Sequence, residues 1–511
     1  MVEEDHQRTR TVMSRRARRL ANLRTTGFAV LVGVAVVAIV GCATTVPPSP
    51  PTTTAPPGPG PATVGPIALG VNVASWDPLY AGTNAAFVDA LMKSAGLRQL
   101  RYPGGSFADD FEWSSTTDSA SCKGAITSSC SRSDPLGFDL FAAQAHSAGA
   151  STFVTVNYGS GTPTEAAQWV AHAAGVPTSG PMLWEVGNES YSCYETNEHL
   201  AAGPTFVHGY RPGGGVCPST KVMARSYAAN ARSYLVAMKH ADPSAHIGVP
   251  WAFQGSVANG AGVADADIWN AEVLHALRSN VSFVDAHWYP FDTIEGVSSQ
   301  QILASVRRIP SVADHIRSTL HRYAPQATFT VGETNISERP TTTDFGPVSA
   351  LFAAATSLEW LAAGATSVDW WDLNNFGSPT TGDFGLLSSG SPETEPADAP
   401  LPPYYGEVLA SMLTSPGSRL RALAALTGST LGFESDLHGR RTVLLVNPAP
   451  TRRSLATPGW FRPAWPTQIE TYSAGTSADS EPIVGSTVSW NSRVSLPAES
   501  IVVLSGDASS S

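Results

Sequence analysis

The sequence predicts a (β/α)₈ barrel followed by a small antiparallel β-sandwich. Short apolar strands alternate with helical segments eight times between residue 66 and about residue 400, which is typical of a closed parallel sheet. Beyond that point the helical pattern stops, and β-type segments separated by turn residues follow. Several of the eight strands also end in polar or aromatic residues, at the end where a barrel of this kind carries its site.

The eight candidate strands are short and rich in β-branched and aromatic residues. They cover Ile67–Val73, Gln99–Tyr102, Thr152–Asn157, Met182–Gly187, His246–Pro250, Ser282–Trp288, Thr328–Gly332 and Ser367–Trp371. The helical segments between them cover Ala85–Ala95, Phe138–Ser147, Pro163–Ala173, Met223–His240, Ala266–Leu277, Gln300–Tyr323 and Val348–Ala362. A doubly wound open sheet is the alternative, but no glycine-rich phosphate motif follows the first strand.

The C-terminal region is expected to open with a last helix, Tyr404–Leu413. The β-type segments that follow are Ser429–Ser435, Thr442–Asn447, Gln468–Ser473, Ser486–Asn491 and Ser500–Leu504. They predict an antiparallel sandwich packed on the barrel. The predicted domain limits are 66–403 for the barrel and 404–511 for the sandwich.

The first 65 residues have the pattern of an export segment and a linker. Five arginines between positions 15 and 24 precede Gly27–Gly41, an apolar run of 15 residues that is shorter than the roughly 20 needed to span a bilayer. Its end, Gly41-Cys42, resembles a bacterial lipobox with Cys42 as the lipidation site. Residues 43–65 are rich in proline and threonine, as in a semi-rigid spacer.

We therefore expect residues 1–42 to be a signal peptide and the mature protein to be exported. It would lie at the extracellular face of the bacterial cell membrane as a lipoprotein, or be secreted. A plain signal peptide or an uncleaved signal anchor is the alternative reading of the same residues.

Composition excludes several classes of protein. The 511 residues are 42% hydrophobic and only 14% charged, which does not fit a disordered chain. The net charge is −11; residues 1–42 hold seven Arg against three acidic residues, or +4, so the remainder carries −15. An acidic body disfavours nucleic acid and anionic membranes as partners. Membrane contact is expected only through the N-terminal anchor, and the oligomeric state is left open.

The cysteine count fits an oxidising compartment. Apart from Cys42 the chain has four cysteines, Cys122, Cys130, Cys193 and Cys217. Four cysteines allow three connectivities. The local pairing, Cys122–Cys130 with Cys193–Cys217, would close one loop each. Because neither pair has C-x-x-C spacing and no histidine accompanies them at metal spacing, we expect no zinc at these cysteines. No other metal and no cofactor is expected.

Polar side chains converge on the predicted active-site end of the barrel. Two apolar strands lead directly to carboxylates, in Trp184-Glu-Val-Gly-Asn-Glu-Ser190 and in Thr330-Val-Gly-Glu-Thr-Asn335. The other candidates at strand ends are Arg101, Asn157, Asn188, His287, Trp288, Tyr289, Trp370 and Trp371. Glu189 and Glu333 at the mouth of one barrel form the pair that cleavage of a glycosidic bond needs, one to hold a proton and one to attack the sugar.

On these motifs the chain resembles the clan A glycoside hydrolases. Asn188-Glu189 after the fourth strand and Glu333 after the seventh follow the clan's pattern. The run RYPGGSFADDFEW from Arg101 and the HWYP from His287 look most like the family 51 arabinofuranosidases, and also like families 39 and 79. The resemblance covers about residues 66–400.

The resemblance implies a role for each of these residues. Glu189 would be the general acid/base, Glu333 the nucleophile, and Asn188 a ligand of the sugar 2-hydroxyl. Arg101 and Tyr289 would orient Glu333 and keep it ionised, and Trp370 or Trp371 would form the floor of the sugar site.

Each role has a plainer structural alternative. Glu185 has the same strand parity as Glu189 but is read as an interior carboxylate paired with a residue such as Arg101. His287 is a structural histidine or a substrate contact. Core packing explains any single tryptophan as well as stacking on a sugar does.

Two departures from family 51 leave the sugar open. Ser106 follows the two glycines where the family commonly has asparagine, and Thr334 follows Glu333 where it often has tryptophan. We expect a retaining glycosidase acting on an envelope or extracellular polysaccharide or glycoconjugate, with α-L-arabinofuranosides as the first expectation. A β-xyloside, β-glucoside or β-glucuronide as substrate, and a non-catalytic carbohydrate-binding barrel, are the alternatives.

Overall fold

The computed structural model describes most of the chain beyond the predicted linker. The described residues are 60–114, 135–192, 195–197, 199, 218–253, 265–339, 346–375, 383–390, 396–424, 426, 428–456, 467–473, 483–488 and 493–507. All of them belong to one compact unit, Pro59–Ser511. The predicted signal peptide, most of the linker and all five cysteines lie outside the described residues. None of the described helices is both long and apolar enough to cross a bilayer.

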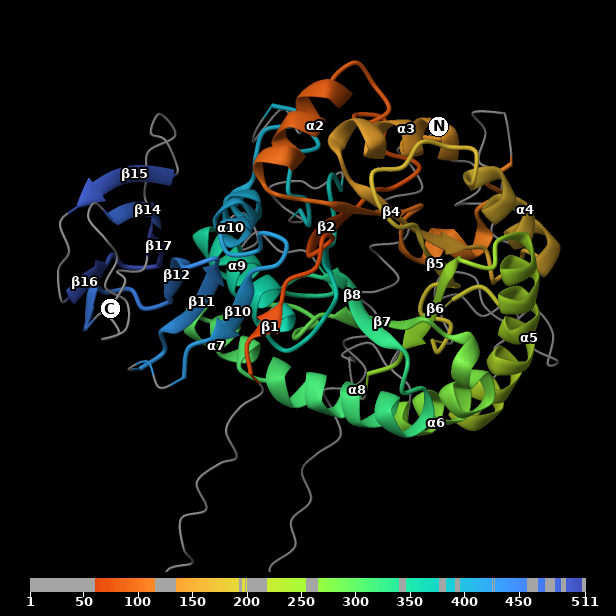
Figure 1. The fold of residues 1–511 in the computed structure, drawn as a ribbon. Coiled ribbons are helices and arrows are strands. Elements are labelled where there is room, and N and C mark those ends of the chain that lie inside the picture. The colour runs from red at the N-terminus through yellow and green to blue at the C-terminus, as the bar shows by residue number, and fades with distance from the viewer. Residues whose placement is uncertain are drawn as a thin grey trace, which may run out of the picture. The chain divides into compact units, whose positions relative to one another are not determined.

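Eight parallel strands form a closed barrel, and the predicted fold class is confirmed (Figure 1). In order around the barrel they are β2 (Leu69–Asn72), β3 (Gln99–Tyr102), β4 (Ser151–Val156), β5 (Leu183–Val186), β6 (His246–Trp251), β7 (Phe283–Trp288), β8 (Thr328–Thr334) and β9 (Val368–Trp370). The last strand pairs with the first, through Leu69 with Val368. Each strand matches one of the predicted segments to within two residues at either end.

The barrel interior is polar as well as apolar. Gln99 on β3 donates to Asp369 Oδ2 on β9 at 2.8 Å, and both side chains are fully buried. Gly70 on β2 faces the same carboxylate: a Cβ at this position would lie 2.1 Å from Asp369 Oδ1. Only glycine therefore leaves room for the hydrogen-bonded layer inside the barrel.

Helices cover the barrel between successive strands. They are α2 (Ala85–Ser94), α3 (Phe138–Ala148), α4 (Pro163–Ala173), α5 (Thr220–Ala241), α6 (Ala266–Leu277), α7 (Ser299–Val306), α8 (Ile309–Tyr323) and α9 (Pro347–Ala362), with short 3₁₀ turns at Gly105–Asp110 and Arg278–Asn280. The single helix predicted over Gln300–Tyr323 is two helices. The break falls before Pro310, which has no N–H to donate and is tolerated only in the first turn of α8.

The C-terminal region is built from two antiparallel sheets. A seven-stranded sheet has the order β1 (Ala62–Thr63), β10 (Arg419–Ala422), β11 (Leu431–Leu437), β12 (Arg440–Asn447), β17 (Ser500–Asp507), β14 (Thr467–Ser473) and β15 (Ile483–Val488). The second sheet pairs β13 (Arg453–Ala456) with β16 (Arg493–Leu496). The sequence pattern missed β1, β10, β13 and β16; β10 and β13 each bury one side chain, too few to show an alternation.

Strict alternation along β12 and β17 explains how the large sheet joins the barrel. Val443 and Val502 pack toward the small sheet, whereas Leu444 and Val503 belong to the core shared with the barrel helices. Helix α10 (Pro402–Ser411) packs on α9 and contains the predicted domain limit at 403–404. Figure 1 shows the strands of the large sheet beside these two helices.

Replacing Leu444 by alanine tests this shared core. The side chain is completely buried on β12, so we expect the free energy of unfolding to fall by about 2–5 kcal/mol. Val236→Ala is the control, because Val236 is 61% exposed on α5 and its loss should change the free energy by less than about 0.5 kcal/mol. Urea denaturation followed by tryptophan fluorescence measures both, and equal effects of the two substitutions would contradict the packing described.

Candidate active site

A buried arginine organises the active-site end of the barrel. Arg101, at the end of β3, is 1% exposed. Its Nη1 donates to Glu333 Oε1 at 2.7 Å and to Asn72 Oδ1 at 3.0 Å. Its Nη2 donates to Glu185 Oε2 at 3.0 Å and to Asn188 Oδ1 at 2.9 Å. One planar guanidinium thus fixes side chains from β2, β5 and β8, which only its forked geometry allows.

The charges around Arg101 do not balance one to one. Asp285 Oδ2 on β7 lies 3.6 Å from the Arg101 Nε, so three carboxylates share one guanidinium. Burial alone would lower the pKa of Arg101, but the charges of Glu185, Glu333 and Asp285 raise it above its ordinary value. Burial and the charge of Asp285 raise the pKa of Glu185 to about 7. Glu185 is thus an interior partner of Arg101, as the sequence suggested.

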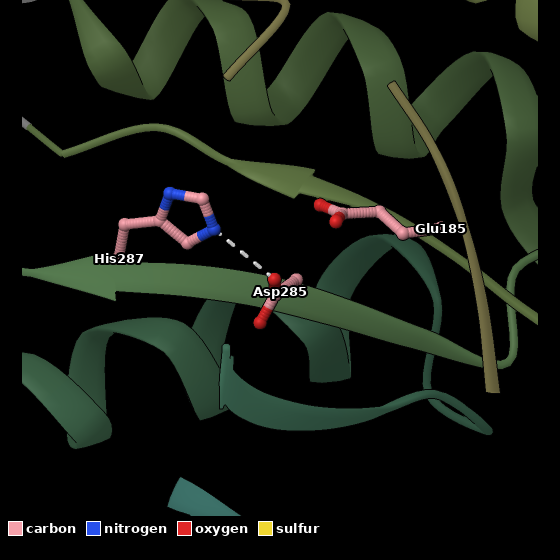
Figure 2. Close-up of side chains that lie close together, drawn as sticks. All are labelled: Glu185, Asp285 and His287. Atoms are coloured by element: carbon pink, nitrogen blue, oxygen red, sulfur yellow. Dashed lines mark hydrogen bonds and ion pairs between the residues drawn. The ribbon is translucent and has the colours of Figure 1, made fainter. Parts of the chain in front are cut away.

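Asp285 links the arginine to the histidine of the same strand. Its Oδ2 lies 3.2 Å from His287 Nε2, and its Oδ1 accepts from the Gly332 N–H at 2.6 Å. Gly332 cannot be another residue, because a Cβ there would lie 2.1 Å from Asp285 Oδ2. Figure 2 shows Asp285, His287 and Glu185 gathered at this point. Their ligand atoms are close enough together to bind a metal ion. The guanidinium of Arg101, however, already pairs with the carboxylates of Glu185 and Asp285.

Glu189 and Glu333 face each other across His287. His287 Nδ1 lies 2.9 Å from Glu189 Oε1 and 3.6 Å from Glu333 Oε2. One oxygen of each glutamate and a nitrogen of the histidine all lie within 4.8 Å of one another. Glu333 Oε2 also accepts from the Tyr289 hydroxyl at 2.8 Å. The two carboxylates therefore share one cavity but have different partners.

The backbone at Glu189 is unusual. Its φ is 39°, in the left-handed region that residues other than glycine rarely adopt. Hydrogen bonds hold the backbone on both sides of Glu189: the Gly187 N–H before it donates to Val156 O at 3.2 Å, and the Ser192 N–H after it donates to Glu189 O at 2.6 Å. Backbone held in such a conformation by its surroundings is common where a side chain must be aimed at a ligand.

Glu189 and His287 form a coupled acid–base pair. Burial alone would raise the pKa of Glu189, but the hydrogen bond and charge of His287 outweigh it and lower the pKa. For His287 burial alone would lower the pKa, whereas the charge of Glu333 and the hydrogen bonds to Asp285 and Glu189 hold it well above its ordinary value. A proton donor in a glycosidase is usually given a raised pKa by an apolar site. Here Glu189 instead has His287 as its neighbour, at 2.9 Å.

These groups open into a pocket of about 220 Å³ at the mouth of the barrel. Its wall is formed by Gly105, Ser106, Asn188, Glu189, Tyr191, His287, Tyr289, Glu333, Glu338, Trp371 and Phe384. Gly105, with φ of 46°, lies against the Trp371 ring, where a Cβ would come within 2.8 Å of Cη2. Gly105 thus lets the indole of Trp371 close one side of the pocket, whereas Gly104 lies against Trp76.

Four of the residues singled out in the sequence do not line this pocket: Arg101 lies behind its wall, and Asn157, Trp288 and Trp370 lie elsewhere. Asn157 holds the loop after β4, accepting from the Ser160 and Gly161 N–H groups at 3.0 and 2.9 Å. Trp288 points away from the barrel axis and packs against Trp360 and Arg308. Trp370 is a core residue whose Nε1 donates to Phe384 O at 2.9 Å.

Two acidic residues near the pocket were not singled out in the sequence. Glu195 is buried behind the wall and accepts from Ser106 Oγ at 2.8 Å and from Asn188 Nδ2 at 3.5 Å. Burial and the charge of Glu189 raise the pKa of Glu195 to about 8. Glu338 lies on the wall itself, five residues after Glu333. Neither belongs to a regular strand, so no periodicity could have marked them.

The fold of this chain is similar to that of solved glycosidase structures. No protein-family model matches the chain, and no curated protein matches it. A family 51 α-L-arabinofuranosidase from Bifidobacterium longum superposes with a TM-score of 0.63 and 15% identity, over 88% of this chain and 97% of that one. An α-L-arabinofuranosidase from Thermotoga maritima, in complex with arabinose, gives 0.63 and 14% over 87% and 98%.

A 4-O-α-L-rhamnosyl-β-D-glucuronidase from Fusarium oxysporum gives a TM-score of 0.60 and 13% identity over 88% of this chain and 98% of that one. The chain therefore has the same fold as these solved glycosidases, among them a family 51 structure, in agreement with the fold that the sequence motifs predicted. At these identities the likeness concerns the fold.

Removing the cation at the centre of the site should destabilise the protein strongly. Arg101→Met keeps the bulk of the side chain but leaves Glu185, Glu333 and Asp285 without a counter-charge, so we expect a loss of about 3–5 kcal/mol in the free energy of unfolding. Arg225→Met is the control: Arg225 makes an exposed ion pair with Glu272, which contributes at most about 1 kcal/mol. Urea denaturation at pH 7 compares the two, and a similar small loss for both would contradict the role given to Arg101.

Proposed function

We propose that this protein is a retaining glycoside hydrolase, with α-L-arabinofuranosides as the first expected substrates. The observation that carries the proposal is the spacing of the two carboxylates, since an oxygen of Glu189 and an oxygen of Glu333 lie within 4.8 Å. Retaining enzymes hold their two carboxyl groups about 5–5.5 Å apart, whereas inverting enzymes leave about 6.5–9.5 Å for a water molecule. The clan A fold and the family 51 neighbours support the same reading.

In the first step Glu333 attacks the anomeric carbon. Arg101 and Tyr289 each donate to one Glu333 oxygen, which aims the carboxylate into the pocket. The leaving oxygen receives a proton from Glu189, and the bond from the sugar to the leaving group breaks as the glycosyl ester with Glu333 forms. The proton comes from the Glu189–His287 pair, in which His287 holds it until a leaving oxygen approaches.

In the second step a water molecule replaces the leaving group. Glu189, now unprotonated, takes a proton from that water, and the hydroxide attacks the anomeric carbon and releases Glu333. The proton returns to the pair with His287, so the site is restored to its starting charge. Asn188 is held by Arg101 through its Oδ1, and its Nδ2 donates to Glu195 at 3.5 Å, which leaves one amide N–H at the pocket wall for a sugar hydroxyl.

We further propose that the enzyme acts outside the cell on an envelope or extracellular polysaccharide or glycoconjugate. The basic segment, the apolar run ending at Cys42 and the Pro- and Thr-rich spacer support export and an N-terminal lipid anchor. Radiolabelled palmitate incorporation that is lost in Cys42→Ala would support the anchor, and equal labelling of both proteins would contradict it.

Substitution of the two carboxylates tests the mechanism. With a panel of aryl furanosides and pyranosides, Glu333→Gln should lose roughly 10⁴-fold or more in kcat because the nucleophile is gone. Glu189→Gln should lose about 10²–10⁴-fold on substrates with poor leaving groups and less on activated ones, since these need no proton. Glu272→Gln, a surface carboxylate on α6, is the control and should keep full activity.

The stereochemistry of the first product gives a second readout. ¹H NMR during hydrolysis should show the anomer of the substrate's own configuration forming first. Inversion would exclude the double displacement, and an unaltered protein without turnover on any glycoside would favour a carbohydrate-binding barrel.

The pH profile tests the part given to His287. Asp285→Asn removes a carboxylate that raises the pKa of His287. The protonated imidazole is needed for the first step, so lowering the pKa of His287 should move the alkaline limb of kcat/KM toward lower pH. Asp267→Asn is the matched control, because Asp267 pairs with His315 at 2.8 Å on the surface, and its profile should not move. An unshifted alkaline limb in Asp285→Asn would contradict the proposal that His287 holds the proton for the first step.

A further inference from the structure

The wall of the pocket carries an excess of negative charge. Three of its described residues are glutamates, Glu189, Glu333 and Glu338, and none is a lysine or an arginine. Among the wall residues that the structure describes, His287 is the one that can carry a positive charge, and it is already hydrogen-bonded to Glu189 and Asp285. Arg101 lies behind the wall, 1% exposed and already bonded to Asn72, Glu185, Asn188 and Glu333.

Glu338 is held at the wall by its backbone. Its N–H donates to Phe291 O at 3.0 Å, which ties the loop after β8 to the loop after β7. The next residue, Arg339, pairs with Asp292 at 3.1 Å and so is directed to a different carboxylate. Within the described part of the chain, the Glu338 carboxyl group has no hydrogen-bond or ion-pair partner, which leaves it available to a ligand.

The surroundings of Glu338 make an added negative charge unfavourable. Burial, together with the charges of Glu189 and Asp292, raises the pKa of Glu338 to about 7, against the opposing charge of Arg339. Above about pH 7, where Glu338 is ionised, a ligand carboxylate about 6 Å from it would bind about 100-fold more weakly than a neutral ligand of the same shape, at an effective dielectric constant of about 20. A carboxyl group accepts hydrogen bonds from sugar hydroxyls without this penalty.

We propose that Glu338 is a specificity-determining residue that binds a hydroxyl of an uncharged sugar and excludes glycosides of uronic acids. The inference rests on the proposed function and narrows it, because it removes β-glucuronides from the possible substrates and retains the arabinofuranoside, xyloside and glucoside. The fold by itself does not make this choice, since one of the similar structures is of a glucuronidase. The choice comes from the side chains on the wall.

Matched substrates and ligands test the proposal. The purified protein is assayed above the pKa of Glu338, at about pH 8, with aryl α-L-arabinofuranoside, β-D-xyloside and β-D-glucoside, and with aryl β-D-glucuronide. We expect turnover of at least one neutral glycoside, with kcat/KM for the glucuronide at least about 100-fold lower. A glucuronide that is the best substrate would overturn the proposal.

Substitution of Glu338 should change this preference. In Glu338→Gln, kcat/KM for the neutral substrate should fall about tenfold because the amide is a weaker acceptor for a hydroxyl, while the glucuronide should gain relative to it. Glu338→Lys, which supplies a cation, should raise the ratio of glucuronide to neutral kcat/KM at least about 100-fold over the parent protein. Glu295→Gln, which removes an exposed carboxylate from the loop after β7, is the control and should leave the ratio unchanged.

Both kcat/KM values in the ratio of glucuronide to neutral substrate are measured on one preparation. Partial misfolding of a variant would lower both values equally and leave the ratio unchanged. An unchanged ratio in both Glu338 variants would overturn the proposal. Calorimetric titration of the parent protein with L-arabinose, D-xylose, D-glucose and D-glucuronate separates this result from a failure of the proposed function. Preferential binding of a neutral sugar without any turnover would overturn the hydrolase alone, and preferential binding of glucuronate would overturn the role of Glu338.

Discussion

The site depends on one buried cation. Arg101 connects β2, β5 and β8 through its guanidinium, and it is the group that makes a barrel interior with Glu185, Asp285 and Glu333 tolerable. Charges removed from water are stable only when they are paired and hydrogen-bonded. The same contacts that satisfy this demand also fix the direction of Glu333 and of Asn188. Stability of the barrel and orientation of the candidate nucleophile are therefore two results of one set of hydrogen bonds.

The two carboxylates in the pocket, Glu189 and Glu333, have different hydrogen-bond partners. Glu333 receives hydrogen bonds from Arg101 and Tyr289, whereas Glu189 meets an imidazole that is itself held by Asp285. A pair of acids in one cavity can take different roles only when their surroundings differ. Here the difference arises from β7, which supplies both Asp285 and His287 on one face and so connects the arginine to the acid/base.

The sequence predicted the regular parts of the molecule well. Eight buried strands with turn residues between them are visible as patterns. Glu333 lies at the end of one such strand, and Glu189 lies three residues beyond the end of another. Alternation also explains what was misplaced: His287 faces the barrel, so the adjacent Trp288 must face the helices, and Trp370 and Trp371 likewise point to opposite sides. Glu338 and Glu195 could not be found, because irregular loops bring them to the site and no periodicity describes a loop. Pro310 is the sequence signal for the break before α8, because a proline fits only the first turn of a helix.

The short strand β1 shows that the folded domain begins before the first barrel strand. Ala62 and Thr63 precede the barrel yet pair with Leu420 and Arg419 of the C-terminal sheet. Strand β1, which precedes the barrel in the sequence, and strand β17, which follows it, thus belong to the same sheet. The barrel strands lie between them in the sequence. A fragment trimmed to the first barrel strand would leave the edge of β10 without its neighbour and open to pairing with another molecule. A force applied to the chain before residue 60 would act first on the pairing of β1 with β10 and not on the residues of the pocket.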